Sequence, residues 1–194
     1  MIQIKTDEEV EVMRKSAKLA AEVLLMIEPY VKPGITTNRL NELCHDFIVS
    51  HGAIPSPLNY RGFPKSICSS VNEEICHGIP SDRKLRNGDV VNLDITTYLN
   101  GFHGDTSRMF HVGSARKKIG RLVDTCKESL QRAIEVVRPG AHLGDIGAIV
   151  QGIAESRGYS VVREFCGHGI GQTFHEEPNI LHYGKKKTGE KIKE

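Results

Sequence analysis

Two aspartates flank the strongest turn signal in the sequence, and their spacing could bring two carboxylates together. Asn100-Gly101 lies between two β-prone runs, a pattern that favours a two-residue hairpin turn. In that hairpin Asp94 faces Ser107 and is a diagonal neighbour of Asp105, about 7–8 Å away at the backbone. A register slip of one residue would place the two aspartates on opposite faces, so their pairing depends on the predicted turn.

Such a pair of carboxylates has two explanations, which the sequence leaves open. Aspartates inside a strand are often satisfied by arginine, threonine or backbone groups. Two like charges on one face repel each other, however, and a divalent cation is a common remedy. Carboxylates combined with imidazole suit Mn, Fe, Co or Zn rather than calcium.

Three histidines in glycine- or proline-rich segments could supply imidazole groups. His168 stands between two glycines that permit close backbone approach, His175 follows seven residues later, and His77 precedes a Gly-Ile-Pro run. Each of them could equally be a structural histidine. Cys76 and Cys166 lie near these histidines and suggest Cys–His nucleophilic catalysis, although the cysteines fit buried apolar side chains better.

The helices expected to position these candidate residues occur as two similar pairs along the chain. Thr6 opens a capping box before a first helix that ends at Pro33-Gly34, and a second helix ends at Gly52. The same endings return at Pro139-Gly140 and Gly158, each 106 residues later. The helix before the second Pro-Gly has an apolar series that predicts one buried face: Ile119, Leu122, Val123, Cys126, Leu130, Ala133 and Ile134.

The constant offset indicates two copies of one unit. We expect a single domain over residues 1–194, with units of about 6–112 and 113–194. The segment that leads into the strand of Asp94 has its counterpart at Lys191, at an offset of 107 residues. The counterpart of Asp94 would therefore fall near position 201, and we expect the second unit to end before its last strands.

Composition excludes several classes of function. The chain has 194 residues, 39% of them hydrophobic and 26% charged, which is typical of one soluble packed domain. A formal net charge of +2 argues against a bulk nucleic-acid or membrane-surface binder. No apolar stretch reaches the roughly 20 residues that span a bilayer, and we expect no signal peptide. Five cysteines without CxxC spacing indicate a reducing cytoplasm.

Three motifs in this sequence resemble type I methionine aminopeptidase. They are Asn59–Cys68 with Asn72–Pro80, Asn92–Asp94 with Asn100–Phe110, and Gly167–Pro178. The resemblance extends from about residue 4 to residue 194. It implies an α+β pita-bread fold with an internal pseudo-twofold repeat, and it implies hydrolytic removal of the initiator methionine from nascent chains in the cytoplasm.

The resemblance also implies a site for two divalent metal ions, of which Co, Mn, Fe and Zn are candidates. Asp94, Asp105 and His168 match three of the family's five ligands, with Asp105 expected to bridge the two ions. The other two ligands of the family are glutamates on strands that would follow residue 194. With three of five ligands, we expect little or no activity from this 194-residue chain.

Further residues match the family's substrate site. His77 matches a catalytic histidine that contacts the substrate near its amino end and scissile bond, and His175 matches one that hydrogen-bonds the substrate amide or the developing oxyanion. Four residues match the family's pocket for the methionine side chain: Tyr60, Phe63, Cys68 and Phe174. Aromatic and sulfur-containing walls suit the polarisable thioether of methionine.

Two other functions remain as alternatives. One is a non-catalytic pita-bread protein that keeps the groove for a peptide or protein partner, and the other is a prolidase or aminopeptidase P type of metallopeptidase. For the aminopeptidase we expect as partners the N-termini of nascent polypeptides with a small second residue, with the ribosome as a candidate. We expect a monomer, no nucleic-acid specificity and no membrane.

Overall fold

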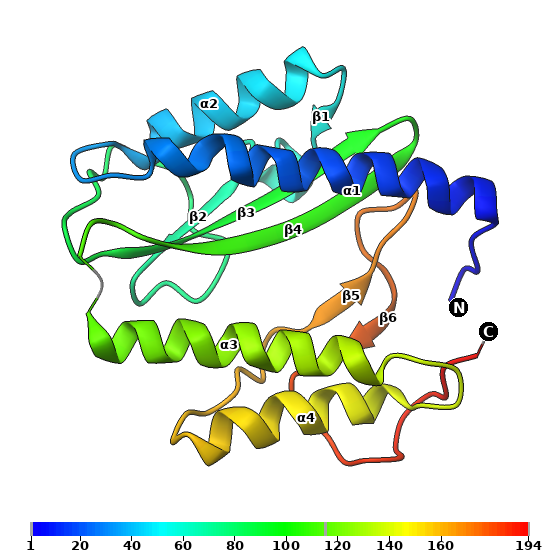
Figure 1. Ribbon diagram of the computed structural model, residues 1–194. Helices are drawn as coiled ribbons and strands as arrows, with labels where there is room; N and C mark the ends of the chain where they lie inside the picture. Colours follow the sequence, from blue (N-terminus) through cyan, green and yellow to red (C-terminus); the bar gives the residue numbers. More distant parts are fainter. Residues whose placement is uncertain (1, 115, 194) are drawn as a thin grey trace. The chain divides into compact units, whose positions relative to one another are not determined.

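The computed structural model describes residues 2–114 and 116–193, which fall into two compact units. The N-terminal unit comprises residues 3–116 and 170–175, and the C-terminal unit comprises residues 117–169 and 176–194 with residues 1–2. Each unit has a pair of helices followed by β-strands (Figure 1). In the described part of the chain, no helix is both long and apolar enough to cross a membrane.

Both helices of the N-terminal unit begin where the sequence predicts, but the first ends at Ile27, six residues before the predicted Pro33-Gly34 stop. Helix α1 (Asp7–Ile27) starts with a capping box in which Thr6 and Glu9 satisfy each other's backbone N–H groups, and a 3₁₀ turn (Glu28–Tyr30) follows it. Helix α2 (Thr37–Ser50) ends two residues before Gly52, which has the positive φ of 73° that glycine tolerates best.

A four-stranded antiparallel sheet is built around strand β3 (Val90–Leu99). Along one edge β3 pairs with β4 (Phe102–His111), and along the other with β2 (Cys68–Val71) and β1 (Ile54–Pro55). In the β3–β4 hairpin Asp94 pairs with Ser107 and Asp105 with Thr96. The predicted register is therefore confirmed, and both aspartates lie on one face of the ribbon.

The two helices α1 and α2 cover only the opposite face of this sheet (Figure 1). Thr97 and Ser16 of α1 exchange hydrogen bonds of 2.9 and 3.0 Å through their hydroxyls and carbonyls. At Gly104, the partner of Thr97, an added Cβ atom would overlap the backbone nitrogen of Ala17, so α1 lies directly on β4. Because side chains alternate along a strand, α1 leaves the face of Asp94 and Asp105 uncovered.

The C-terminal unit repeats the local pattern of the first. It contains α3 (Lys117–Val136), α4 (Leu143–Ser156) and a two-stranded sheet of β5 (Gly167–Gly169) and β6 (Glu176–Ile180). Gly34 N–H donates to Leu85 O at 2.8 Å, and Gly140 N–H donates to Ile192 O at 2.9 Å. These two bonds join residues at the predicted offsets of 106 and 107, so the internal repeat is confirmed at the level of individual hydrogen bonds.

The predicted amphipathic helix forms as α3, but its apolar series is only partly buried, with Ile119 and Val123 half-buried. Thr125, Ser129 and Ala133 are buried, whereas Leu130 and Ile134 are each 61% exposed. Cys126 is exposed as well, so only Cys44 and Cys68 match the expectation of buried cysteines. The reason lies in the sheet: α1 packs on β3 and β4, whereas the C-terminal unit has only the short strands β5 and β6 among the described residues.

Candidate active site

The carboxyls of Asp94 and Asp105 form the acidic part of the candidate site. Asp94 is half-buried in the central strand, and Asp105 is exposed on β4. Burial raises the pKa of Asp94 to about 7, and the charge of Asp105 and a hydrogen bond between the two side chains add to this shift. The pair therefore holds a shared proton below about pH 7 and carries two charges only above it when no cation is bound.

Cys68 lies next to Asp94 across the β2–β3 pairing. Burial raises the pKa of the Cys68 thiol to about 12, and the charges of Asp94 and Asp105 add to the shift. The thiol is therefore neutral at physiological pH, and it remains a predicted wall of the substrate pocket. A thiolate nucleophile is disfavoured here, as burial also raises the pKa of Cys76.

His168 belongs to the C-terminal unit, where it lies on β5 at a β-bulge. Its Nδ1 atom is 2.8 Å from the carbonyl oxygen of Gly169. A carbonyl only accepts, so Nδ1 carries the proton in this contact and Nε2 has the lone pair that a metal ligand needs. A Cβ atom at Gly169 would overlap the backbone carbonyl of Glu177, which explains why glycine follows the histidine.

The structure brings together some of the predicted ligands. Asp94 and Asp105 share one sheet face and interact directly, whereas His168 is described with the other unit. Among residues 2–114 and 116–193, no group of three or more histidine, cysteine or acidic side chains converges as a metal site. The three-residue ligand set remains a prediction.

The predicted substrate residues Tyr60, Phe174 and His175 form one ring cluster in the N-terminal unit. Ring centroids are 4.8 Å apart for Tyr60 and Phe174, 5.3 Å for Tyr60 and His175, and 4.4 Å for Phe174 and His175. The Tyr60 hydroxyl also lies 2.9 Å from His175 Nδ1. Residues more than 110 positions apart in the chain thus share one aromatic wall.

His77 and Phe63 complete the predicted substrate set on neighbouring segments. His77 has a positive φ of 56°, a backbone conformation that non-glycine residues rarely adopt and that often occurs at functional sites. It is held beside β2 because the N–H of Ser69 donates to the carbonyl of Gly78 at 2.8 Å. Phe63 is half-buried at the end of the tight turn that carries Tyr60.

His103 is a positioning residue of this region that the sequence analysis did not single out. Its backbone N–H donates to the carbonyl of Gly171 at 2.8 Å, and its ring stacks on Phe174 at 5.3 Å. Its Nδ1 atom is 2.8 Å from the hydroxyl of Ser56. The hairpin register already places His103 opposite Tyr98, but its contact with segment 170–175 has no local signal in the sequence.

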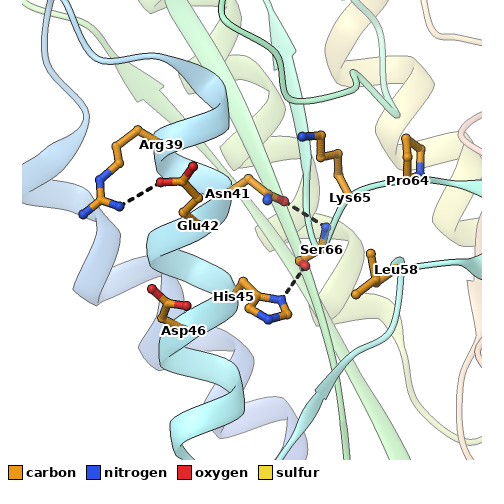
Figure 2. Close-up of a pocket in the computed structure, with 9 residues that line it drawn as sticks. All are labelled: Arg39, Asn41, Glu42, His45, Asp46, Leu58, Pro64, Lys65 and Ser66. Carbon is orange, nitrogen blue, oxygen red and sulfur yellow. Dashed lines mark hydrogen bonds and ion pairs between the residues drawn. The ribbon is translucent and has the colours of Figure 1, made fainter.

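Helix α2 anchors the other end of the loop that carries Tyr60 and Phe63. Asn41 Oδ1 accepts the N–H groups of Ser66 and Ile67 at 2.8 and 3.3 Å. His45 Nδ1 lies 2.8 Å from the Ser66 hydroxyl (Figure 2). A cavity of about 390 Å³ lies here, and none of the predicted catalytic residues lines it. Of its lining residues, Arg39 and Glu42 pair with each other on α2, whereas Asn41 and His45 hold Ser66 and so fix the loop on α2.

Comparison with known proteins places the chain among metallopeptidases. The model of metallopeptidase family M24 matches residues 11–194. A curated protein of Rickettsia prowazekii (strain Madrid E) named methionine aminopeptidase is 55% identical over 193 residues, which is 100% of this chain and 74% of that relative.

Solved structures give the same result for the fold. The crystal structure of methionine aminopeptidase from Rickettsia prowazekii matches with a TM-score of 0.99 and 56% identity, over 100% of this chain and 78% of that one. The prolidase from Pyrococcus furiosus matches with a TM-score of 0.79 at 23% identity, which shows a shared fold alone. The predicted α+β pita-bread fold is confirmed by these matches.

Proposed function

The chain belongs to the methionine aminopeptidases of metallopeptidase family M24, and we propose that it removes N-terminal methionine through a site built from Asp94, Asp105 and His168. One observation supports this assignment to residues: two carboxyls that interact directly stand on one face of a central hairpin, and α1 packs on the other face. The proposed substrates are the N-termini of nascent polypeptides with a small second residue.

The side chains present fit divalent cations. The pKa of Asp94 is raised to about 7 by burial and by Asp105, and a bound cation would offset both the burial and the repulsion. His168 supports the fit because its Nδ1–H contact with Gly169 O leaves Nε2 as the nitrogen with a lone pair. We propose two ions, for which Mn, Fe, Co and Zn suit a mixed carboxylate and imidazole set.

In the proposed reaction, Asp94, Asp105 and His168 hold the ions, which when bound lower the pKa of a water molecule and polarise the scissile carbonyl. His77 and His175 then act on the substrate. Each can donate a hydrogen bond from a ring N–H to the scissile carbonyl oxygen, and such a bond strengthens as negative charge develops on that oxygen in the transition state. Only the first residue of a polypeptide carries a free α-amino group, so recognition of that group would restrict cleavage to the first residue.

Specificity for methionine is assigned to the ring cluster and the Cys68 thiol. Tyr60 and Phe174 lie 4.8 Å apart and present apolar surface, and Phe63 lies on the same turn as Tyr60. Cys68 adds a neutral sulfur beside Asp94. A flexible thioether gains dispersion contacts in such a slot. A charged side chain would instead lose its hydration there, which disfavours its binding.

We place the enzyme in the cytoplasm as a monomer that meets chains at the ribosome. All five cysteines are free thiols, which supports a reducing compartment. The substrate class requires an enzyme with access to nascent chains.

Metal binding and methionine release together test this function. Loss of the free Mn²⁺ signal in electron paramagnetic resonance would report binding to the 194-residue chain. Release of methionine from Met-Ala-Ser would be followed with Mn²⁺ or Co²⁺ and with a chelator. We expect Mn²⁺ binding that Asp105→Asn weakens at least tenfold, because one of two carboxylates is lost.

We expect methionine release to require the added metal ion and to fall in Asp105→Asn together with Mn²⁺ binding, because the proposed ions activate the water. Asp124→Asn removes an exposed carboxylate of α3 and should leave binding unchanged. Equal Mn²⁺ binding by wild type and Asp105→Asn would contradict the assigned site.

A further inference from the structure

The hydroxyl of Tyr60 has a role that a pocket wall alone does not require. It lies 2.9 Å from Nδ1 of His175, although the two residues are 115 positions apart in the chain. We propose that Tyr60 is a positioning residue, whose hydroxyl donates to Nδ1 and thereby keeps the proton of neutral His175 on Nε2. The catalytic value of this arrangement rests on the proposed function of His175.

The chemistry of the two groups favours this direction of donation. A neutral imidazole has one N–H donor and one acceptor nitrogen, and its tautomer follows the partner that each nitrogen meets. A phenol has a single O–H and is a better donor than acceptor, because its lone pairs are delocalised into the ring. With Nδ1 accepting from Tyr60, a hydrogen bond from His175 to a substrate carbonyl can come only from Nε2–H.

The ring contacts hold the imidazole in the orientation that this hydrogen bond needs. The rings of Tyr60 and His175 are nearly parallel, at 19° with centroids 5.3 Å apart. Phe174 contacts the His175 ring at 4.4 Å and the Tyr60 ring at 4.8 Å. The imidazole therefore has little freedom to flip and exchange its two nitrogens.

The turn that carries Tyr60 is itself fixed. Asn59 and Arg61, on either side of Tyr60, have positive φ values of 66° and 49°. Such values are costly for non-glycine residues and persist where surrounding contacts impose them. Here the N–H of Asn59 donates to Phe63 O at 2.8 Å, and the N–H of Phe63 donates to Tyr60 O at 2.9 Å. The Tyr60 side chain thus projects from a rigid support.

A phenylalanine at position 60 would preserve the aromatic wall and remove only the hydroxyl. Tyr60→Phe is therefore the discriminating variant, and Tyr98→Phe is its matched control. The ring of Tyr98 contacts that of His103 in a tilted arrangement, with centroids 4.6 Å apart in the same unit, so that variant removes a hydroxyl from an aromatic pair without a change at His175 or at its hydrogen-bond partner Tyr60.

The test uses the 194-residue chain labelled with ¹⁵N-histidine and kept free of metal. Long-range ¹H–¹⁵N correlation spectra at pH 8 report which ring nitrogen carries the proton, and His175→Gln assigns the signals. We expect Nδ1 of His175 to be unprotonated in wild type and in Tyr98→Phe. In Tyr60→Phe we expect the fraction protonated at Nδ1 to rise at least twofold, with unchanged backbone spectra outside the cluster.

A wild-type spectrum with the proton on Nδ1, or an unchanged tautomer in Tyr60→Phe, overturns the inference whether or not the chain releases methionine. A changed tautomer together with a kcat reduced at least fivefold, at a similar KM, supports the inference and the role of His175. A changed tautomer with unchanged kcat supports the coupling of Tyr60 to His175 and overturns the catalytic role proposed for that histidine.

Discussion

At the scale of single residues, the Asp94 carboxyl illustrates a conflict between binding a cation and stabilising the fold. The side chain is half-buried beside Asp105, and both burial and repulsion disfavour its charged form. An unfolded aspartate ionises with a pKa of about 3.9. The folded pKa of about 7 is higher, so ionisation of Asp94 lowers the free energy of unfolding. This free energy is at its full value below about pH 4 and falls as the pH rises from there through 7.

Asp94→Asn should therefore stabilise the metal-free chain at pH 8, and the effect should be smaller at pH 5, where only part of the linked stability has been lost. The amide stays neutral at both pH values, and we expect a gain on the order of 1–3 kcal/mol at pH 8 relative to the change at pH 5. Urea unfolding with chelator present measures this difference. The control Asp124→Asn should show no such pH dependence. An equal effect of Asp94→Asn at both pH values would contradict the claim that ionised Asp94 destabilises the metal-free fold.

At the scale of elements, the site depends on loops that helices hold from behind. Asn41 of α2 accepts two consecutive backbone N–H groups directly before β2, the strand that begins with Cys68. Helix α1 lies on Gly104 of β4, one residue from Asp105. Both helices therefore act on the site through backbone contacts rather than through substrate contacts.

Asn41→Ala should destabilise the N-terminal unit by about 1–3 kcal/mol, because it leaves two part-buried N–H groups without their acceptor. Asn38→Ala is the matched control on the same helix, since its side chain bonds to the side chains of the exposed Asp82 and of Lys65 rather than to backbone N–H groups of the loop. Urea midpoints of the two variants provide the comparison. Equal losses in both would mean that the α2 contact does not fix the loop.

Gly104→Ala should be among the most damaging single-methyl additions in the chain. The new Cβ would overlap the backbone of Ala17, so helix or strand must move, and we expect a loss of about 3 kcal/mol or more. In contrast, an added Cβ at Gly152 in α4 meets nothing within 4 Å, and Gly152→Ala should stabilise its helix by about 0.5–1 kcal/mol. Thermal unfolding of both variants checks the opposite signs.

At the scale of the whole molecule, the two units bury unequal amounts of helix surface. The N-terminal unit has a continuous core on one side of its four-stranded sheet, whereas α3 exposes an apolar stripe. The stripe consists of four side chains that are 42–61% exposed: Leu122, Leu130, Ile134 and Val137. Contiguous exposed apolar surface of this kind binds apolar probes.

The combined change Leu130→Gln and Ile134→Gln should lower the fluorescence of bound anilinonaphthalene sulfonate at least twofold. Its folding free energy should stay within about 0.5 kcal/mol of wild type, because both side chains are 61% exposed. Leu25→Gln, at a single leucine of α1 that is 64% exposed, is the matched control and should leave probe binding unchanged. Undiminished probe fluorescence in the double variant would show that the stripe is not the binding surface.

Features governed by neighbouring residues were determined by the sequence. The Asn100-Gly101 turn sets the register that pairs Asp94 with Ser107, and the Thr6 capping box sets the start of α1. The Pro-Gly endings of the helices identify the repeat, since backbone geometry at these positions depends on a few adjacent side chains. The resemblance of the sequence motifs to the family then predicted which residues are metal ligands.

Only the tertiary structure decided which distant residues meet and which apolar faces are covered. The contact of Tyr60 with His175, the support of Phe174 by His103, and the exposure of Leu130 all depend on how elements pack. Hydrophobic periodicity predicts that a helix face is apolar, but not that a sheet lies against it. Contacts over long sequence separations follow from the three-dimensional arrangement, because no local backbone preference encodes them.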